Sequence, residues 1–232
     1  MNILGDRIGA ANREQKVIEL EGNQMAKKGT TTVGLVCSDG LVFAADRRAS
    51  MGYFIAAKDV DKIHQIDERM ALTIAGSVAD AQTLVRVMQA ELRLYKMRNG
   101  EAMSIGAATT MLSNIMFQYK MFPFYVQLLL GGIDKVPVIY NLDPIGGVTT
   151  ENIVSTGSGS PMVYGLLEDQ YREGKPIKEN VKLAVRSIAT AMKRDAATGE
   201  NIDLVHISRD GFKRYTRDEV KKMLQEIYGK AE

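Results

Sequence analysis

Residues that often carry metal, redox or acyl-transfer chemistry are scarce in this sequence. Its 232 residues include no tryptophan, one cysteine, Cys37, and two histidines, His64 and His206. A single cysteine can form neither an internal disulfide nor a paired-cysteine metal site, and the two histidines lack the spacing of a metal cluster. We therefore expect no cofactor, no metal and a reducing setting, namely the cytoplasm.

Net charge and long apolar runs are also in short supply. The formal net charge is only +2, which does not indicate a nucleic-acid-binding protein. No apolar run is long enough to cross a membrane, and charges at Asp6, Arg13 and Glu19 break up the first 29 residues, which excludes a secretory signal. With 45% hydrophobic and 25% charged residues, the composition is typical of one soluble globular domain that contacts neither nucleic acid nor membrane.

Several common catalytic and phosphate-binding motifs are absent as well. The sequence has no G-x-S-x-G nucleophile elbow and no glycine-rich loop of the Walker or dinucleotide type. Cys37 has no plausible histidine partner and lies inside an apolar run, where a small thiol packs as a hydrophobe. These absences direct the search towards hydroxyl nucleophiles.

Blocks of strand-like and helix-like sequence follow one another along the chain. Apolar and β-branched runs predict strands at residues 30–37, 41–48, 62–66, 70–76, 124–134, 136–143 and 202–208. Helical spacing predicts helices at residues 79–100, 108–119, 160–170 and 181–192, with Ser160 as the N-cap of the third, and a charged helix at the C-terminus. This order is not a strict β-α-β alternation, so we expect an α+β fold in which two antiparallel sheets lie between two helical layers.

Thr30 stands out among the hydroxyl residues because it follows Gly29 at the start of the first predicted strand. A threonine hydroxyl is too weak an acid to attack an amide unless a base removes its proton. Cleavage after Gly29 would free an α-amino group, whose pKa of about 7.7–8.0 suits a general base at neutral pH better than a lysine near ~10.4. Gly29 suits this position because a residue without a Cβ bends easily and exposes its carbonyl.

Seven stretches occur together in one order: GTTTVGL, AADRRAS, KIHQID, LTIAGSVADAQ, QLLLGGID, STGSGSP and KRDAATGENID. With them, residues 30–200 resemble the catalytic β-subunit of archaeal-type proteasomes, which are N-terminal nucleophile (Ntn) hydrolases. The resemblance implies a four-layer αββα sandwich of two antiparallel sheets flanked by helix pairs. It also implies a propeptide, residues 1–29, that is removed autocatalytically, and a catalytic domain of residues 30–232.

The resemblance also implies the roles of individual residues in a threonine endopeptidase. Thr30 corresponds to the nucleophile, Asp46 and Lys62 to its charge partners, Gly76 to the donor of the oxyanion N–H, and Ser158, Asp195 and Thr198 to the network around the amine. Two residues depart from the common pattern. Asp46 stands where glutamate is frequent, which keeps the charge and shortens the reach, and Thr198 stands where serine is usual, so that its methyl group crowds the amine.

A substrate pocket follows from the same resemblance. Ala49, Val60, Ile74 and Val78 would line the pocket for the side chain before the cut bond, and Ser50 and Gly76 would hold the peptide through backbone hydrogen bonds. All four wall residues are small or aliphatic, which predicts a chymotrypsin-like preference for apolar side chains. His64 shares a strand face with Lys62 and either borders this site or, as we favour, has a structural role.

Assembly is implied by the resemblance alone. Seven copies would form a ring, two such rings would stack, rings of α-subunits would cap them, and a regulatory ATPase would deliver unfolded polypeptides. Two other functions stay open at this point. One is a non-catalytic structural ring subunit of the same fold, although such a subunit would have no use for Thr30 and its partners together. The other is an Ntn hydrolase that acts on small amides.

Overall fold

The computed structural model describes residues 29–229, so the expected propeptide lies outside the described residues except for Gly29. The elements within this range are β1 (Thr31–Cys37), β2 (Gly40–Asp46), β3 (Ala49–Met51), β4 (Phe54–Ala57), β5 (Ile63–Asp67), β6 (Met70–Gly76), α2 (Val78–Asn99), α3 (Ile105–Gln118), β7 (Val126–Ile133), β8 (Pro137–Leu142), β9 (Val148–Thr150), β10 (Ile153–Gly157), α4 (Ser160–Gln170), α5 (Ile177–Met192), β11 (Ile202–Ser208), β12 (Gly211–Arg214) and α6 (Arg217–Tyr228). The α+β class expected from the sequence is confirmed.

The strands form two five-stranded antiparallel sheets and one separate hairpin. The first sheet has the order β10-β1-β2-β11-β12 and the second the order β5-β6-β7-β8-β9, while β3 and β4 pair with each other. Cys37 pairs with Gly40, so the predicted turn at residues 38–40 closes the β1–β2 hairpin in two residues. Sequence patterns missed the short strands β3, β4, β9, β10 and β12.

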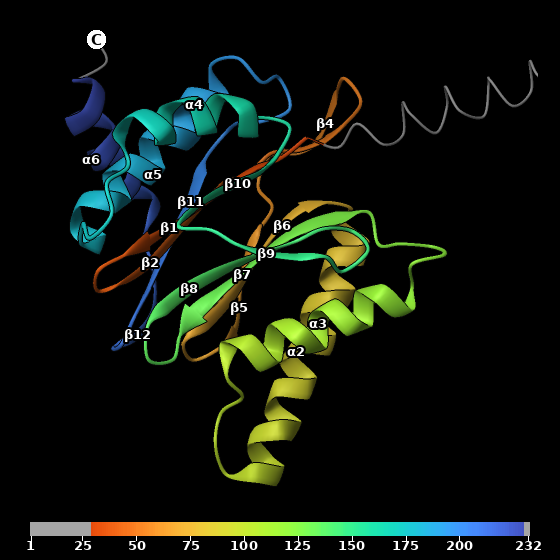
Figure 1. Cartoon of the computed structure of the whole chain (residues 1–232). Helices are drawn as coiled ribbons and strands as arrows, with labels where there is room; N and C mark the ends of the chain where they lie inside the picture. Colours follow the sequence, from red (N-terminus) through yellow and green to blue (C-terminus); the bar gives the residue numbers. More distant parts are fainter. Residues whose placement is uncertain (1–28, 230–232) are drawn as a thin grey trace, which may run out of the picture.

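Three apolar clusters connect the sheets and helices. Residues of β1, β2 and β11 pack against α4, α5 and α6, and residues of β5 to β8 pack against α2 and α3. A third cluster, which includes Phe43, Leu129 and Val205, joins the two sheets to each other. Figure 1 shows the same arrangement, with α4, α5 and α6 on one side of the paired sheets and α2 and α3 on the other. Within residues 29–229, one side therefore carries three helices rather than the expected pair.

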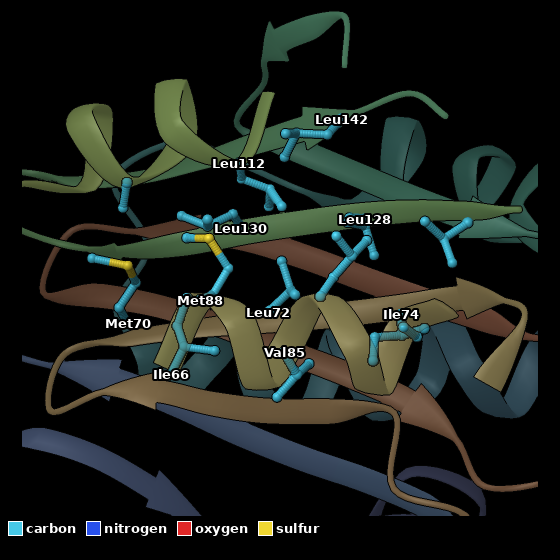
Figure 2. Packing of buried hydrophobic residues seen from close by; sticks show 14 of the residues in the cluster. Ile66, Met70, Leu72, Ile74, Val85, Met88, Leu112, Leu128, Leu130 and Leu142 are labelled. Atoms are coloured by element: carbon cyan, nitrogen blue, oxygen red, sulfur yellow. The ribbon is translucent and has the colours of Figure 1, made fainter. Parts of the chain in front are cut away.

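The cluster under α2 and α3 explains why the helical spacing was readable in the sequence. Val85 and Met88 of α2, Leu112 of α3 and the strand residues Leu72 and Leu130 all belong to this cluster (Figure 2). Each of these five side chains is buried. Removing such apolar area from water contributes roughly 25 cal/mol per Å² to folding, which favours the helices that present a continuous apolar face.

Close packing shapes a glycine in β7 and the start of α4. Gly131 lies at a close approach, since a Cβ there would lie 2.7 Å from the ring of Phe43. Ser160, expected as an N-cap, is instead the first residue of α4, and Gly159 holds the N-cap position without a side-chain bond. A Cβ on Gly159 would lie 2.2 Å from Thr31 Oγ1, so tight packing of this loop against β1 sets the helix start.

None of the helices within residues 29–229 is long and apolar enough to span a membrane. The same residues contain no group of three or more histidine, cysteine or acidic side chains arranged to hold a metal ion. Cys37 is buried in the cluster under α4 to α6, as its apolar surroundings predicted, and burial raises the pKa of its thiol to about 11.

Candidate active site

Thr30 lies immediately before β1 and is buried, with 5% of its surface exposed. Its hydroxyl donates a hydrogen bond to the carbonyl oxygen of Gly29 at 2.8 Å. The Gly29 N–H donates to Ser50 Oγ at 3.0 Å, so the segment before Thr30 is held by a side chain of β3. The hydroxyl is therefore next to the carbonyl of the peptide bond that precedes it.

Asp46 and Lys62 form a buried ion pair, with 2.7 Å between Lys62 Nζ and Asp46 Oδ1. The same carboxylate oxygen accepts the N–H of Thr31 at 2.9 Å, which ties the pair to the start of β1. Lys62 Nζ also donates to the carbonyl of Arg48 at 2.7 Å. Burial lowers the pKa of Lys62, and the neighbouring Asp46 acts against this shift. Since Lys62 and Thr30 line one pocket, the structure brings the predicted charge pair and the predicted nucleophile together.

Ser158, Asp195 and Thr198 also meet, although they come from two separate loops. Asp195 Oδ2 accepts hydrogen bonds from Ser158 Oγ at 2.6 Å and from Thr198 Oγ1 at 2.5 Å. Ser158 Oγ further donates to the carbonyl oxygen of Thr30 at 3.3 Å. The hydroxyls of Thr198 and Thr31 are 2.6 Å apart. The three predicted residues thus form one hydrogen-bonded chain beside the Thr30–Thr31 backbone.

Arg48, for which the sequence predicted no role, connects several parts of this region. Its N–H donates to Asp46 Oδ2 at 3.0 Å, and its guanidinium donates to the carbonyl of Ala196 at 2.7 Å and pairs with Glu200 at 3.0 Å. Gly199 N–H donates to the same oxygen of Asp46 at 3.1 Å. Arg48 therefore links the charge pair to the loop of residues 195–200. The sequence feature that could have indicated Arg48 is its place in the motif AADRRAS, two residues after Asp46.

Gly76 ends β6, one residue before Ser77, the N-cap of α2, as the sequence predicted. Its φ of +123° is one that residues with a side chain rarely adopt, and a Cβ there would lie 2.3 Å from the carbonyl oxygen of Tyr125. Gly76 lines the pocket beside Thr30. Gly76 therefore lies at the N-terminal end of α2 and in the pocket that Thr30 also lines.

A pocket opens beside Thr30, and all five residues predicted to bind substrate line it: Ala49, Ser50, Val60, Ile74 and Val78. Asp61, Ala81 and Gln82, which were not predicted, also belong to the wall, as does His64, which was expected either to border the site or, as favoured, to have a structural role. The side chain of Ser50 also accepts the Gly29 N–H, a contact that the sequence did not predict. The wall has an apolar part, which includes Ala49, Val60 and Ile74, and a polar part, which includes Asp61 and His64.

Asp61 lines the pocket but is neutralised by two arginines. Its carboxylate pairs with Arg47 at 2.7 Å and with Arg214 at 3.3 Å. Both arginines also lie near Asp203, a buried carboxylate, at 3.6 and 3.5 Å. His64 borders the same polar part, and burial lowers the pKa of its imidazole, opposed by Asp61.

The same sequence can be compared with known proteins. A family model described as "Proteasome subunit" matches residues 26–207. The chain belongs to the proteasome subunit family.

Its relatives include several archaeal proteins named "Proteasome subunit beta". That of Methanosarcina mazei is 54% identical over 201 residues, which are 86% of this chain and 96% of that protein. That of Methanohalophilus mahii is 53% identical over 207 residues, 88% of this chain and 99% of that protein. That of Archaeoglobus profundus is 49% identical over 202 residues, 86% and 94% of the two chains. The resemblance to archaeal proteasome β-subunits is confirmed.

Proposed function

We propose that this chain is a catalytic β-subunit of a proteasome core particle and acts as a threonine endopeptidase. Thr30 is the nucleophile, and its α-amine, freed by cleavage of the Gly29–Thr30 bond, is the general base. The observation that carries the proposal is the 2.8 Å hydrogen bond from the Thr30 hydroxyl to the Gly29 carbonyl, beside a buried lysine–aspartate pair. We also infer that the two sheets and their helices form the four-layer αββα sandwich of Ntn hydrolases.

Removal of the leader begins with attack within the chain. The Thr30 hydroxyl oxygen bonds to the Gly29 carbonyl carbon, the C–N bond breaks, and the nitrogen takes up the proton, which leaves an ester between Gly29 and Thr30. Water then hydrolyses the ester, giving the Gly29 carboxylate and a Thr30 with free hydroxyl and amine. Lys62, whose charge Asp46 balances, stabilises the negative oxygen that forms during these steps.

Turnover of substrates uses the same oxygen with a different base. The free α-amine takes the hydroxyl proton, the oxygen attacks the substrate carbonyl carbon, and the C–N bond breaks as the protonated amine gives its proton to the leaving nitrogen. Water then hydrolyses the resulting ester, which releases the acyl fragment as a carboxylate and restores the Thr30 hydroxyl. The Gly76 N–H stabilises the oxyanion at the N-terminus of α2. The chain formed by Ser158, Asp195 and Thr198 positions the amine, which is the role supported by its contact with the Thr30 carbonyl.

The proposed preference is for apolar side chains before the cut bond. The apolar part of the wall, with Ala49, Val60 and Ile74, desolvates such a side chain without leaving a charge unpaired. Asp61 does not create a basic-residue pocket in this proposal, because Arg47 and Arg214 already balance its charge.

The proposed setting is the cytoplasm, in an assembly. Homo-heptameric β-rings stack in pairs, α-subunit rings cap them, and a regulatory ATPase feeds unfolded polypeptides into the interior. Names of the relatives support a place in a proteasome, and the finer arrangement is part of the proposal.

Intact-mass measurement after co-assembly of the full chain with α-subunits tests the proposal. The wild-type chain should lose residues 1–29 and hydrolyse an apolar fluorogenic peptide. Thr30→Ala should keep its full length and show no turnover, because it lacks the nucleophilic oxygen.

A matched control is Thr149→Ala, which removes an exposed hydroxyl on β9. This variant should be processed and active like the wild type. Full activity with the leader retained would refute the mechanism. An inactive wild-type chain that still assembles would favour the structural ring subunit, and turnover of small amides alone would favour the third class.

A further inference from the structure

Gly29 lies against a single side chain of the loop that follows α5. A Cβ built on Gly29 would lie 1.7 Å from Ala197 Cβ and 2.8 Å from Ala197 Cα, with Ser158 Oγ next at 3.1 Å. Ordinary contacts between such atoms begin near ~3.5 Å, so even the smallest side chain overlaps Ala197. A Cβ cannot rotate away from its own backbone, and relief therefore requires movement of the main chain.

The loop that carries Ala197 is fixed at several points. The Ala197 N–H donates to Asp195 Oδ1 at 3.1 Å, and Arg48 holds the carbonyl of Ala196 at 2.7 Å. On the far side, Gly199 N–H donates to Asp46 Oδ2 at 3.1 Å. A shift of Ala197 would disturb Asp46 and Asp195, two groups of the site itself.

Gly29 is held from its other side as well. Its N–H donates to Ser50 Oγ, and its carbonyl accepts the Thr30 hydroxyl. Movement of Gly29 away from Ala197 would alter both contacts, including the one that places the nucleophile beside the carbonyl. Neither side of the contact can yield without loss of the reactive geometry.

From these contacts we propose that Ala197 is the specificity-determining residue of leader cleavage: its methyl group restricts the residue before Thr30 to glycine. Ala197 acts by exclusion and takes no part in bond making. This inference rests on the proposed function, since it concerns the cleavage of the Gly29–Thr30 bond. It replaces the expected reason for glycine at this position, backbone bending, with a steric one.

A suppressor experiment tests the inference on the full chain co-assembled with α-subunits, with leader loss followed over time by intact mass. Gly29→Ala should slow cleavage about a hundredfold, because an extra methyl must be forced into a packed site. Ala197→Gly should cleave like the wild type. The double variant Gly29→Ala with Ala197→Gly should cleave about tenfold faster than Gly29→Ala alone, because the methyl 1.7 Å away is gone, but should stay slower than the wild type, because the Cα of residue 197 still lies 2.8 Å from the added Cβ.

The control replaces the neighbouring alanine, which is exposed. Gly29→Ala with Ala196→Gly should stay as slow as Gly29→Ala alone. Rescue by Ala197→Gly but not by Ala196→Gly supports the inference. Normal cleavage of Gly29→Ala, or equal failure of both double variants, overturns it while the proposed function stands. Failure of the wild-type chain to lose its leader overturns the proposed function itself.

The Ala197→Gly single variant shows whether the loop of residues 195–200 keeps its structure without the alanine side chain. If this single variant assembles and cleaves, a failed double variant counts against the inference. A second readout is the rate with Ala197→Val, which adds bulk to the wall facing an intact Gly29 and should slow leader loss. Cleavage of Ala197→Val at the wild-type rate would contradict steric control by this residue.

Discussion

Two clusters of charged residues start at the adjacent residues Asp46 and Arg47, and they differ in direction and in exposure to water. Asp46 pairs inward with Lys62, and their side chains are 0% and 6% exposed. Arg47 pairs outward with Asp59 and Asp61, whose side chains are 48% and 50% exposed. Asp61 and Lys62 are neighbours as well, so one short segment supplies both clusters.

The difference shows how the same pair of charges can serve chemistry or packing. The inward pair is removed from water, and the Thr31 N–H, the Gly199 N–H and the Arg48 carbonyl satisfy it further. Removing one member would leave a buried charge without its partner, which is far costlier than loss of a surface pair. The outward cluster holds residues 59–61 in place, and water screens most of its members.

Lys62→Ala should produce the largest effect. We expect leader cleavage and peptide hydrolysis to fall by about a thousandfold, since the positive charge near the developing oxyanion is lost. The free energy of unfolding should also drop by about 3–5 kcal/mol, because Asp46 stays buried and loses its partner. Intact mass, peptide turnover and urea denaturation measure these effects. Lys58→Ala, at an exposed lysine, is the control and should change none of them.

Arg47→Ala tests the outward cluster. Arg47 is one of two arginines near the buried carboxylate of Asp203, and in the variant only Arg214 would remain beside it. We therefore expect the free energy of unfolding to fall by about 2 kcal/mol. Residual activity should stay well above that of Lys62→Ala. Arg217→Ala is the matched control, because within this cluster Arg217 pairs with the exposed Asp59 and not with Asp203. The midpoint of its urea denaturation should equal that of the wild type. Equal losses from both arginines would erase the distinction between the clusters.

Ser158→Ala tests the edge of the inward site. It removes the hydroxyl that joins Asp195 to the Thr30 carbonyl, and we expect peptide turnover to fall about tenfold with a stability loss of about 1 kcal/mol. Steady-state kinetics on the processed enzyme measures the first effect. The control is Ser113→Ala, which removes from α3 a hydroxyl that donates to the carbonyl of Gly146 and should leave turnover unchanged. A similar drop in both variants would assign the effect to general destabilisation.

His64 lines the pocket together with Lys62 and lies near Asp61 of the outward cluster, and we expect its replacement to have the smallest effect. Because burial lowers its pKa, the unfolded chain binds a proton more readily than the folded chain. Its contribution to stability is therefore present above the ordinary histidine pKa of about 6.5 and is lost as pH falls through the lower folded value. NMR titration of the ring protons should give a midpoint below 6.5, and His64→Gln should weaken the acid dependence of thermal unfolding. His206 serves as an internal comparison, since burial lowers its pKa too. A His64 midpoint at or above 6.5 would contradict the prediction.

The sequence predicted the long elements and the residues of the site's inner part. Helices α2 and α5 were readable because their apolar faces repeat at helical spacing, and the paired strands β1 and β2 because of their apolar runs around a turn. Thr30, Asp46 and Lys62 were found through motifs; in the structure Thr30 and Lys62 line one pocket, and Asp46 pairs with Lys62. Their catalytic roles are still proposals.

Features that depend on distant contacts could not be predicted in this way. Strand β10 was not predicted from its own sequence, and in the structure it pairs with residues 31 to 35 of β1. Ala197 is an ordinary alanine in sequence, and its importance comes only from its approach to Gly29. Asp61 likewise gives no sign of reaching the pocket until the chain is folded.

The three residues Asp46, Arg47 and Arg48 face alternate directions along an extended segment. Asp46 and Arg48 serve the site, and Arg47 serves the outward cluster. Inserting or deleting one residue here would exchange the two directions at once, placing an arginine against Lys62. The length of this segment is thus under stricter constraint than the identity of any one side chain, and natural variation in it should take the form of replacements rather than gains or losses of residues.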